Sequence, residues 1–401
     1  MLELEEALAR ILSQVPPAVA ERIGLSDADG RVLSEPAVSA MDLPPFDNSA
    51  MDGYAVRSAD VISAKPESPV RLRLAGKVAA GETFSGEVKA GTCVRLFTGS
   101  PLPHGADAVV MQEDTRIEPG ASQDVLVLDA AKSGEHVRFQ GEDVKRGSRL
   151  AEAGDILTIG RISLLAANGF SNVSAGRRPV VGVVATGSEL REPGQSLGPG
   201  QIYESNRVGL SAMIRRAGGM PKVWALVPDS LARTRLALAE AFNQCDAVVT
   251  SGGASVGEMD FIKEALTQES GTVQFWKVAI KPGRPFAFGQ QEKKLFFGLP
   301  GNPVSALVTF LLLVRPALLR WQGAKEVGPE THPGTLGENL ANPGERRHFM
   351  RVKVDEAGTV YSAGAQASHM LSSMASANGL VDVAPRTTLA MGASVQVLRW
   401  E

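Results

Sequence analysis

The chain has 401 residues, enough for roughly two to four domains at the usual domain size. A hydrophobic share of 44% and a charged share of 21% are ordinary for a globular protein, and the net charge of −3 argues against a global attraction to nucleic acid or anionic membranes. Cys93 and Cys245 fit no disulfide or zinc pattern, and no secretory signal pattern follows Met1, so we expect a cytoplasmic protein.

The first predicted element is an amphipathic helix. Apolar side chains recur at helical spacing from Leu4 to Val15, which places them on one face. Pro16-Pro17 end the pattern, because proline cannot donate the backbone hydrogen bond that a helix interior needs.

The stretch 41–56 is predicted to be a loop of unusual composition. Its prolines, Asn48 and Gly53 exclude a regular helix, yet it also holds three aspartates and several large apolar residues. In one interpretation the apolar residues anchor the loop and the aspartates cap turns. In the other, which we favour, Asp47 or Asp52 reaches a site formed with another part of the chain or with another subunit.

Residues 70–144 predict a small β-rich domain, in which glycines mark the turns between strands. The predicted strands are 70–74, 93–97, 108–111 and 125–128. Thr98 to Pro103 has the composition of a loop between two of them. A helix is then predicted from Thr158 to Asn168, with Gly169 as its stop.

Beyond Val180, strands alternate with helices, which predicts a parallel sheet covered on both faces. We expect strands at 180–184, 223–227 and 247–249, and helices around 210–217, over 231–242 and from Phe261, where Asp260 is the expected N-cap. The strand ends carry no GxGxxG or P-loop motif, so nicotinamide binding and ordinary ATP hydrolysis lose support.

Polar residues follow each of these strands, at the edge where ligands of open α/β sheets collect. Glycines after the third strand let backbone N–H groups approach an anion, whereas Glu258 and Asp260 repel phosphate unless a cation such as Mg²⁺ lies between them. Alternatively, Asp229 and Glu189 could each cap the start of a helix, and the loop could be a tight turn with an aspartate cap. The gathering of all these residues at one edge favours a binding site. The residues are Thr186, Ser188, Glu189, Asp229 and the loop from Ser251 to Asp260.

Lys277 and Lys281 lie on one side of a predicted extended segment, and Arg284 follows across a proline-glycine turn. These cations could clamp phosphates or a tetrahedral oxyanion. Alternatively, they belong to a solvated edge strand that lysine protects from pairing.

The C-terminal part combines an apolar helix with further strands. The helix is expected to begin at Pro303, and its apolar run 304–319 is shorter than the ~20 residues of a membrane span, so we expect a core or interface helix and no membrane partner. Strands are predicted at 349–354, 359–362 and 394–398.

Six of these segments occur in the order seen in the MoeA family, the molybdopterin molybdenumtransferases to which the gephyrin E domain is related, and the chain resembles that family over essentially its whole length. The segments are Asn48–Ala55, Thr98-Gly99, Thr186–Leu190, Ser251–Asp260, Lys277–Gly283 and Gly298–Ser305. Each motif alone is moderately specific, and their order makes coincidence improbable.

The resemblance implies a multidomain α/β plus β fold in an elongated subunit. Its centre would be a parallel α/β sandwich domain resembling the molybdopterin-binding fold, with a β-rich N-terminal domain and a C-terminal β-barrel. The implied boundaries are 1–26 with 144–176 for a helical and linker domain, 27–143 for the β-rich domain, 177–326 for the α/β domain and 327–401 for the barrel.

The resemblance also implies an enzyme of molybdenum cofactor biosynthesis. Family members insert molybdate into adenylylated molybdopterin with the help of Mg²⁺, and release AMP and the molybdenum cofactor. A homodimer is implied, with the molybdopterin adenylyltransferase and molybdoenzyme acceptors as further partners. Asp52 and Thr98 would complete the site from the partner subunit.

By the same resemblance, the catalytic residues are Asp52, Glu189, Asp229, Asp260, Lys277 and Lys281, of which Glu189, Asp229 and Asp260 would hold the metal. The implied substrate-binding residues are Thr98, Thr186, Ser188, Ser251, Gly252, Gly253, Ser255, Gly257, Arg284, Pro300, Gly301, Asn302, Pro303, Arg351 and Ser372. Arg284 departs from the family, which often has lysine there, and a planar guanidinium is no geometric equivalent of an ammonium group.

Two other functions are weighed against this one. The α/β domain alone resembles molybdopterin adenylyltransferases, but the N-terminal half with Asp52-Gly53 argues against that step. A noncatalytic gephyrin-like scaffold is the second alternative, and the collection of carboxylates and lysines argues against an inactive protein.

Overall fold

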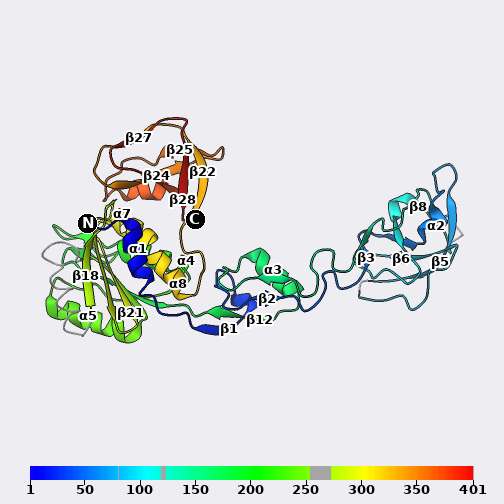
Figure 1. The fold of residues 1–401 in the computed structure, drawn as a ribbon, viewed down its shortest axis with the longest axis horizontal. Helices are drawn as coiled ribbons and strands as arrows, with labels where there is room; N and C mark the ends of the chain where they lie inside the picture. Colours follow the sequence, from blue (N-terminus) through cyan, green and yellow to red (C-terminus); the bar gives the residue numbers. More distant parts are fainter. Residues whose placement is uncertain (80, 119–122, 253–271, 401) are drawn as a thin grey trace. The chain divides into compact units, whose positions relative to one another are not determined.

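The computed structural model describes residues 1–79, 81–118, 123–252 and 272–400, and it divides into two compact units. The large unit comprises Met1–Glu35, Ala153–Thr158 and Asn172–Glu401. The small unit comprises Pro36–Glu152 and Ile159–Ser171 (Figure 1). The four-domain boundaries inferred from the sequence stay a prediction.

A mixed six-stranded sheet forms the centre of the large unit. Its first four strands are parallel, and its last two are antiparallel to their neighbours. In spatial order the strands are β16 (Met220–Val223), β13 (Val180–Ala185), β17 (Ala247–Ser251), β21 (Lys294–Leu299), β20 (Pro285–Gln291) and β18 (Thr272–Lys277).

The expected parallel sheet is therefore mixed at one edge. Only Glu292 and Lys293 separate β20 from β21, and so short a loop can join antiparallel strands but not parallel ones. Glu292 has a φ of 56°, the left-handed conformation that tight hairpin turns need.

The strand predicted at 223–227 begins earlier than expected. Gly218, with a φ of 78°, ends the preceding helix, and the Met220 amide already donates to the Pro179 carbonyl at 2.8 Å. Pairing with β13 therefore starts at Met220, while Val227 forms an isolated bridge to Thr186. The apolar run at 224–227 is the end of this segment rather than the strand itself.

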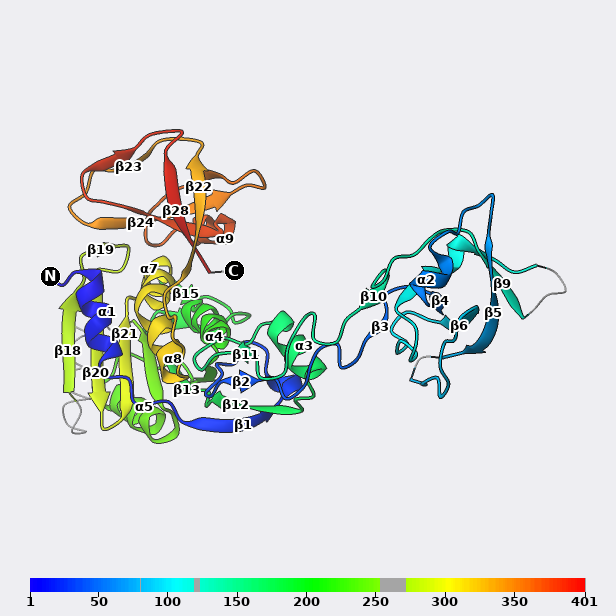
Figure 2. The same ribbon diagram turned by 45° about the vertical axis from the view of Figure 1, so that its right-hand side comes forward.

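Alternate residues of the parallel strands face opposite layers, as a strand's period of two requires. Val183, Val249 and Phe297 pack in one core with the helices of one layer, and Val184, Val248 and Phe296 pack against the other layer. Figure 2 shows the ribbons of the sheet and of the helices that lie against it. The first layer is α1 (Leu4–Leu12), α4 (Asn206–Arg216), α7 (Pro303–Thr309), the π-helical η3 (Phe310–Val314) and α8 (Arg315–Trp321), and the second includes α5 (Leu231–Gln244).

The helix that begins at Pro303 is a core helix, as the sequence indicates. By length and composition Pro303–Trp321 is apolar enough to cross a membrane, but 83% of its most apolar window is buried in the protein. Pro316 is tolerated because it lies in the first turn of α8, directly after the π-helical segment η3.

The C-terminal strands close into a barrel, which confirms that part of the predicted fold. Neighbouring strands are hydrogen-bonded around the ring, and pairing of β24 with β26 closes it, so the ring has no free edge. Val352, Val360, Val381 and Val397 fill its interior. The ring is β24 (Arg347–Val354), β25 (Thr359–Ser362), β22 (Glu330–Leu336), β28 (Ser394–Arg399) and β26 (Gly379–Val383).

Short elements connect these layers. Strand β19 (Ile280–Lys281) leaves the sheet region and pairs in parallel with β24, which places Lys281 opposite His348. The others in the large unit are β1 (Ala20–Gly24) paired with β12 (Asn172–Gly176), η1 (Leu25–Asp27), β14 (Leu190–Arg191) paired with β15 (Ile202–Tyr203), β23 (Leu340–Asn342) paired with β27 (Thr387–Leu389), and α9 (Leu371–Ser376).

The small unit is β-rich, as predicted, and is built around a second six-stranded sheet. In spatial order this sheet is β7 (Ala108–Met111), β4 (Gly53–Val56), β6 (Thr92–Leu96), β5 (Val70–Lys77), β9 (Asp124–Val127) and β8 (Thr115–Arg116). The remaining elements are β2 (Ala37–Val38) paired with β11 (Arg149–Ala151), β3 (Asn48–Ser49) paired with β10 (Val137–Arg138), α2 (Ser58–Val61), η2 (Gln112–Asp114) and α3 (Ile159–Ala167).

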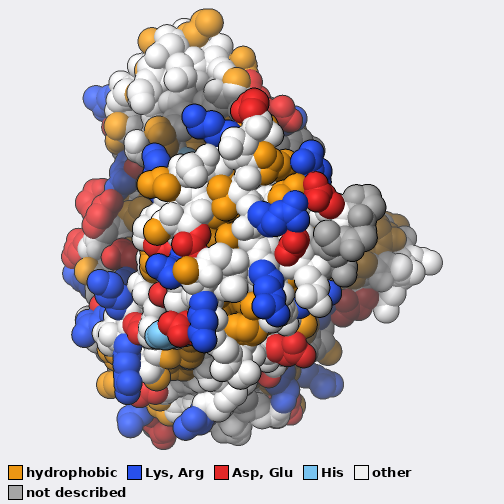
Figure 3. Space-filling view, turned by 90° about the vertical axis from the view of Figure 1, so that its right-hand side faces the viewer, with side chains coloured by type: hydrophobic (Ala, Val, Ile, Leu, Met, Phe, Trp, Pro, Cys, Tyr) orange, Lys and Arg blue, Asp and Glu red, His pale blue; other side chains and the backbone are white. Residues whose placement is uncertain are grey.

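Charges of both signs are interspersed on the face drawn in Figure 3, with hydrophobic side chains between them. This distribution agrees with the small net charge of −3. Attraction of an anionic ligand therefore depends on local clusters of cations.

Gly53 and Gly160 offer a matched pair of substitutions in the small unit. A Cβ atom at Gly53 would lie 2.1 Å from the Val110 carbonyl oxygen, whereas a Cβ atom at Gly160 meets nothing within 4 Å. Gly53→Ala is expected to lower the free energy of unfolding of this unit by ~1–3 kcal/mol through overpacking. Gly160→Ala, in α3, is expected to raise it by ~0.5 kcal/mol. Denaturant unfolding of both variants checks this, and equal effects would contradict the packing of β4 against β7.

Candidate functional site

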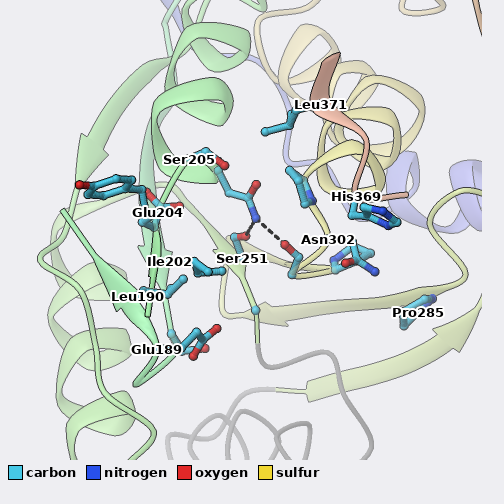
Figure 4. Close-up of a pocket in the computed structure, with 17 residues that line it drawn as sticks. Glu189, Leu190, Ile202, Glu204, Ser205, Ser251, Pro285, Asn302, His369 and Leu371 are labelled. Carbon is cyan, nitrogen blue, oxygen red and sulfur yellow. Dashed lines mark hydrogen bonds between the residues drawn. The ribbon is translucent and has the colours of Figure 1, made fainter. Parts of the chain in front are cut away.

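A cavity of about 630 Å³ opens at the carboxyl ends of β13, β17 and β21 (Figure 4). The parallel register places Ala185 beside Ser251 and Ser251 beside Leu299, so the three strands end at the same level. The loops that follow them therefore surround one space, as expected for an open α/β sheet. Predicted site residues that line it are Thr186, Glu189, Ser251, Gly252, Pro300, Gly301, Asn302 and Pro303.

Gly252 fixes how closely two of these loops approach. Its φ is 90°, and a Cβ atom there would lie 2.6 Å from the Thr186 carbonyl oxygen. Only glycine fits that backbone position without displacing Thr186. Beyond it, the predicted Gly253, Ser255, Gly257 and Asp260 lie outside the described residues.

Ser188 and Asp229 tie the loop after β13 to the segment before α5. The Asp229 Oδ2 atom accepts from the Ser188 amide at 2.9 Å, and the Ser188 Oγ atom accepts from the Asp229 amide at 3.1 Å. Asp229 thus holds the loop that carries Glu189, whereas the start of α5 has no side-chain cap, so the interpretation of Asp229 as a helix-start cap is wrong. Neither Ser188 nor Asp229 lines the cavity.

A second cavity, of about 540 Å³, adjoins the first and shares Pro285 and Asn302 with it. Among the described residues, the charged side chains that line it are all cations, namely Lys281, Arg284 and Arg346. Burial lowers the pKa of Arg346 below its ordinary value, and the nearby Arg284 lowers it further. The cavity is thus a region of positive electrostatic potential, and a bound anion would reduce the repulsion between its cations.

His348 is the strand partner of Lys281 and is almost fully buried. Burial, together with the positive charges of Lys281, Arg351 and Arg346, lowers the pKa of His348 to about 4. The imidazole is therefore neutral at ordinary pH and adds no cation to the cluster.

Lys277 lies apart from Lys281. It is exposed at the end of β18, where its carbonyl accepts from the Leu2 amide at 2.9 Å, and it lines neither cavity. The predicted extended geometry is interrupted between the two lysines, because β18 ends at Lys277 and β19 pairs with the barrel.

Arg351 is fully buried in the barrel rather than directed into a cavity. Its guanidinium donates to the Ser373 Oγ atom at 2.8 Å and to the carbonyls of Ala365 and Ala367 at 2.9 and 3.2 Å. It therefore holds the stretch that ends in Ala367 and Ser368, which line the basic cavity. Ser372, exposed on α9, lines neither cavity, so direct oxyanion contacts from both residues stay predictions.

In the small unit, Asp52 and Thr98 are brought together although they are far apart in the sequence. The Asp52 Oδ1 atom accepts from both the amide and the hydroxyl of Thr98, each at 2.8 Å. These hydrogen bonds, from the amide first, lower the pKa of Asp52, so the exposed carboxylate stays charged in mildly acidic solution. Asp47 instead caps the Gln140 amide at 2.7 Å.

Several residues of the first cavity escaped the sequence analysis, among them Tyr203, Glu204, Asn206 and His369. Asn206 is the first residue of α4, and asparagine at a helix start ordinarily indicates a cap. His369 comes from the barrel segment, far away in the sequence. Tyr203 and Glu204 reach the strand end through the pairing of β14 with β15. No sequence pattern predicted that pairing.

In the described part of the chain, both cysteine thiols are buried and no cluster of three metal ligands is preassembled. Burial raises the pKa of Cys93 to about 12 and that of Cys245 to about 11, so neither is a ready nucleophile. Within residues 1–79, 81–118, 123–252 and 272–400, no group of three His, Cys, Asp or Glu side chains could hold a metal ion. The predicted set of Glu189, Asp229 and Asp260 extends beyond these residues.

Comparison with known proteins gives matches along most of the chain. Family models match residues 2–169 as the MoeA N-terminal region (domain I and II), 182–320 as a probable molybdopterin binding domain, and 333–400 as the MoeA C-terminal region (domain IV). The molybdopterin molybdenumtransferase of Haemophilus influenzae is 40% identical over 384 residues, which cover 94% of this chain and 93% of that protein. This chain belongs to the MoeA family.

Two other members of the MoeA family are also similar to this chain over nearly its whole length. Molybdopterin molybdenumtransferase 2 of Mycobacterium tuberculosis is 38% identical over 385 residues, with 94% of each chain covered. The crystal structure of the molybdopterin biosynthesis MoeA protein of Pyrococcus horikoshii superposes with a TM-score of 0.82 at 30% identity, over 100% of both chains. The resemblance inferred from six motifs in order is confirmed.

The Asp52–Thr98 pair makes a pH-dependent prediction. Thr98→Ala removes the hydroxyl donor but keeps the amide, so the pKa of Asp52 should rise part of the way to its ordinary value. Because the folded pKa is depressed, stabilisation by this pair is present above the unfolded pKa and is lost as pH falls through the folded one. Carboxyl-carbon NMR titration of Asp52 measures the shift.

The matched control is Thr92→Ala, since the Thr92 hydroxyl donates to the Lys89 carbonyl and touches no carboxylate. It should leave the Asp52 titration unchanged. An Asp52 pKa that is unaltered in Thr98→Ala would show that the hydroxyl does not hold the charged carboxylate.

Proposed function

We propose that this protein is an enzyme of molybdenum cofactor biosynthesis that inserts molybdenum into molybdopterin. The observation that carries the proposal is the alignment with proteins named molybdopterin molybdenumtransferase over 94% of the chain. The family models for residues 182–320 and 333–400 include every residue that lines the two cavities. The finer proposal is that adenylylated molybdopterin and molybdate are the substrates, and that AMP leaves with formation of the cofactor.

The first cavity suits the anionic part of adenylylated molybdopterin. Ser251 supplies a hydroxyl at the sheet edge, and Gly252 lets the backbone of the neighbouring loop approach closely. Asn302 and Pro303 open the long core helix, whose N-terminal end carries partial positive charge. The first helical N–H group, that of Val304, already donates to the Ser368 carbonyl at 3.2 Å. Gly253, Ser255 and Gly257 would extend this cradle.

A divalent ion such as Mg²⁺ fits the chemistry of the oxygen donors at this edge. Glu189 lines the cavity, and Asp229 stands beside it with one carboxylate oxygen engaged by the Ser188 amide. Mg²⁺ is commonly held by one or two carboxylates together with substrate phosphates, so Glu189 and Asp229 could hold it with Asp260 as a third ligand. When bound, the ion would offset the charge of the pyrophosphate and polarise its oxygens.

The basic cavity suits the tetrahedral molybdate dianion. Lys281 supplies a compact cation and Arg284 a planar one, and both line the cavity together with Arg346. Because this cavity adjoins the first at Pro285 and Asn302, two bound substrates would lie next to each other. Binding both substrates side by side would make their reaction a step within one complex, which no longer requires the two to meet in solution. Lys277 would act at the margin of this site.

We further propose a homodimer in which Asp52 and Thr98 of one subunit complete the site of the other. The charged state of Asp52, kept by the two Thr98 donors, supports a role in orienting a cation or a hydroxyl group. A molybdopterin adenylyltransferase would supply the substrate, and molybdoenzymes would accept the product.

The test of the function is AMP release from purified adenylylated molybdopterin with Mg²⁺, with and without molybdate. Molybdate-dependent AMP release together with active cofactor is expected. Pyrophosphate release from molybdopterin and ATP, without AMP release in the first assay, would instead assign the protein to the adenylylation step. Silence in both assays would favour the scaffold alternative.

Lys281→Ala is expected to raise the KM for molybdate by at least roughly 10-fold, because a charge-assisted contact to the dianion is lost. Steady-state kinetics with varied molybdate measure the change. Lys353→Ala is the matched control, since Lys353 is exposed on β24 and lines neither cavity. Equal KM values for the Lys281 variant, the Lys353 variant and the unaltered protein would remove Lys281 from the oxyanion site.

The dimer proposal predicts complementation between two inactive variants. Asp52→Ala and Glu189→Ala place their defects in different subunits of each shared site, so hybrid dimers regain one intact site. In a random mixture of two-fold dimers, roughly a quarter of all sites would be intact. AMP release after mixing and subunit exchange measures the recovery. Demonstrated exchange without any recovery would place both residues in the site of one subunit.

A further inference from the structure

Asn206 joins segments that line the first cavity from different parts of the chain. Its Nδ2 atom donates to the Ser251 Oγ atom at 2.6 Å and to the Gly301 carbonyl oxygen at 2.8 Å, the contacts marked by dashed lines in Figure 4. It thereby connects the start of α4 to the end of β17 and to the loop between β21 and α7.

These contacts fix the direction of each hydrogen bond. A backbone carbonyl such as that of Gly301 can only accept, so the amide atom that faces it must be Nδ2 and not Oδ1. The same Nδ2 atom faces Ser251, whose Oγ atom therefore accepts its remaining hydrogen. The hydroxyl hydrogen of Ser251 is then directed elsewhere.

Nothing among the described residues accepts that hydrogen from Ser251. The serine is almost completely buried, at 3% exposed, yet it lines the cavity. A buried hydroxyl without an acceptor costs free energy unless a ligand supplies one. An anionic oxygen in the cavity would meet this need.

The position of Asn206 is held firmly by its neighbour Arg207, which is 5% exposed. The Arg207 guanidinium donates to Glu204 at 3.0 Å, to Glu192 at 2.7 Å and to the Trp224 carbonyl at 2.6 Å. The first turn of α4 is thus clamped to the segments on either side of it. Asn206 has little freedom to leave Ser251 and Gly301.

We infer that Asn206 is a positioning residue that makes Ser251 a hydrogen-bond donor toward an anionic oxygen of the substrate. The identity of that substrate as adenylylated molybdopterin rests on the proposed function. A hydroxyl that donates to a phosphate oxygen forms a short, charge-assisted hydrogen bond. Asn206 itself touches Ser251 and Gly301 and acts through the serine.

The sharpest variant is Asn206→Asp, which preserves shape and reverses the hydrogen bond. An ionised carboxylate only accepts, so it would capture the Ser251 hydrogen and face the Gly301 carbonyl without a donor. We expect the dissociation constant and KM for adenylylated molybdopterin to rise roughly 10- to 100-fold. The KM for molybdate should stay within ~2-fold, since the basic cavity is untouched.

The test is a double-mutant cycle with Ser251→Ala, read as equilibrium binding of adenylylated molybdopterin without molybdate. Ser251→Ala alone should weaken binding to a similar degree, and Asn206→Asp should add less than ~3-fold in that background. Asn243→Asp, an exposed asparagine of α5, is the control for the added charge and should bind normally. Thermal unfolding of each variant verifies that it is folded.

Equal losses from Asn206→Asp in both backgrounds would overturn the inference, because the residue would then act through Gly301 or the fold. Unchanged binding in Ser251→Ala, or no binding by the unaltered protein, would overturn it as well. Binding by the unaltered protein without molybdate-dependent AMP release would refute the proposed function alone, since the cycle would still decide the role of Asn206.

Asn206→Ser is the second variant, for use if Asn206→Asp distorts the fold, because serine keeps a hydroxyl donor. Partial retention of binding in Asn206→Ser would support the inference. Complete loss of binding would contradict it.

Discussion

The parallel register of β13, β17 and β21 is the constraint on which the rest of the site depends. Ala185, Ser251 and Leu299 end their strands side by side, so the loops after them leave the sheet together. Buried side chains on both faces hold that register, since a slip by one residue would exchange the faces of each strand. Gly252 then permits an approach to the Thr186 carbonyl that a larger residue would block.

The basic half of the site depends on the barrel as well as the sheet. Pairing of Lys281 with His348 fixes the proline-glycine turn against β24, and Arg351 holds the neighbouring backbone through buried hydrogen bonds. The cations that face the cavity are therefore placed by residues that never reach it. Hydroxyls and carboxylates come from the strand ends, cations come from the junction with the barrel, and the two cavities meet at Asn302.

Much of this arrangement could be predicted from the sequence because it depends on periodicity and strand order. The apolar run of β17, the helix start at Pro303 and the barrel strands were all predicted, and the strand ends placed Thr186 and Ser251 together. The antiparallel strands at one edge of the sheet were not predicted, since a two-residue hairpin without glycine gives a weak sequence signal. The sequence suggested that Arg351 contacts an oxyanion. Its burial among backbone carbonyls could not be foreseen, because that burial depends on how distant segments pack. Asn206 escaped because its partners, Ser251 and Gly301, come from distant segments.

The central claim is that the strand-end cavity and the adjoining basic cavity are two halves of one site. Its most direct test is a crystal structure with adenylylated molybdopterin bound in the absence of molybdate, and a second with molybdate alone. The account predicts phosphate oxygens at Ser251 and Gly252 in the first, and an oxyanion against Lys281 and Arg284 in the second. A ligand bound elsewhere, with these residues left in contact with solvent, would contradict it.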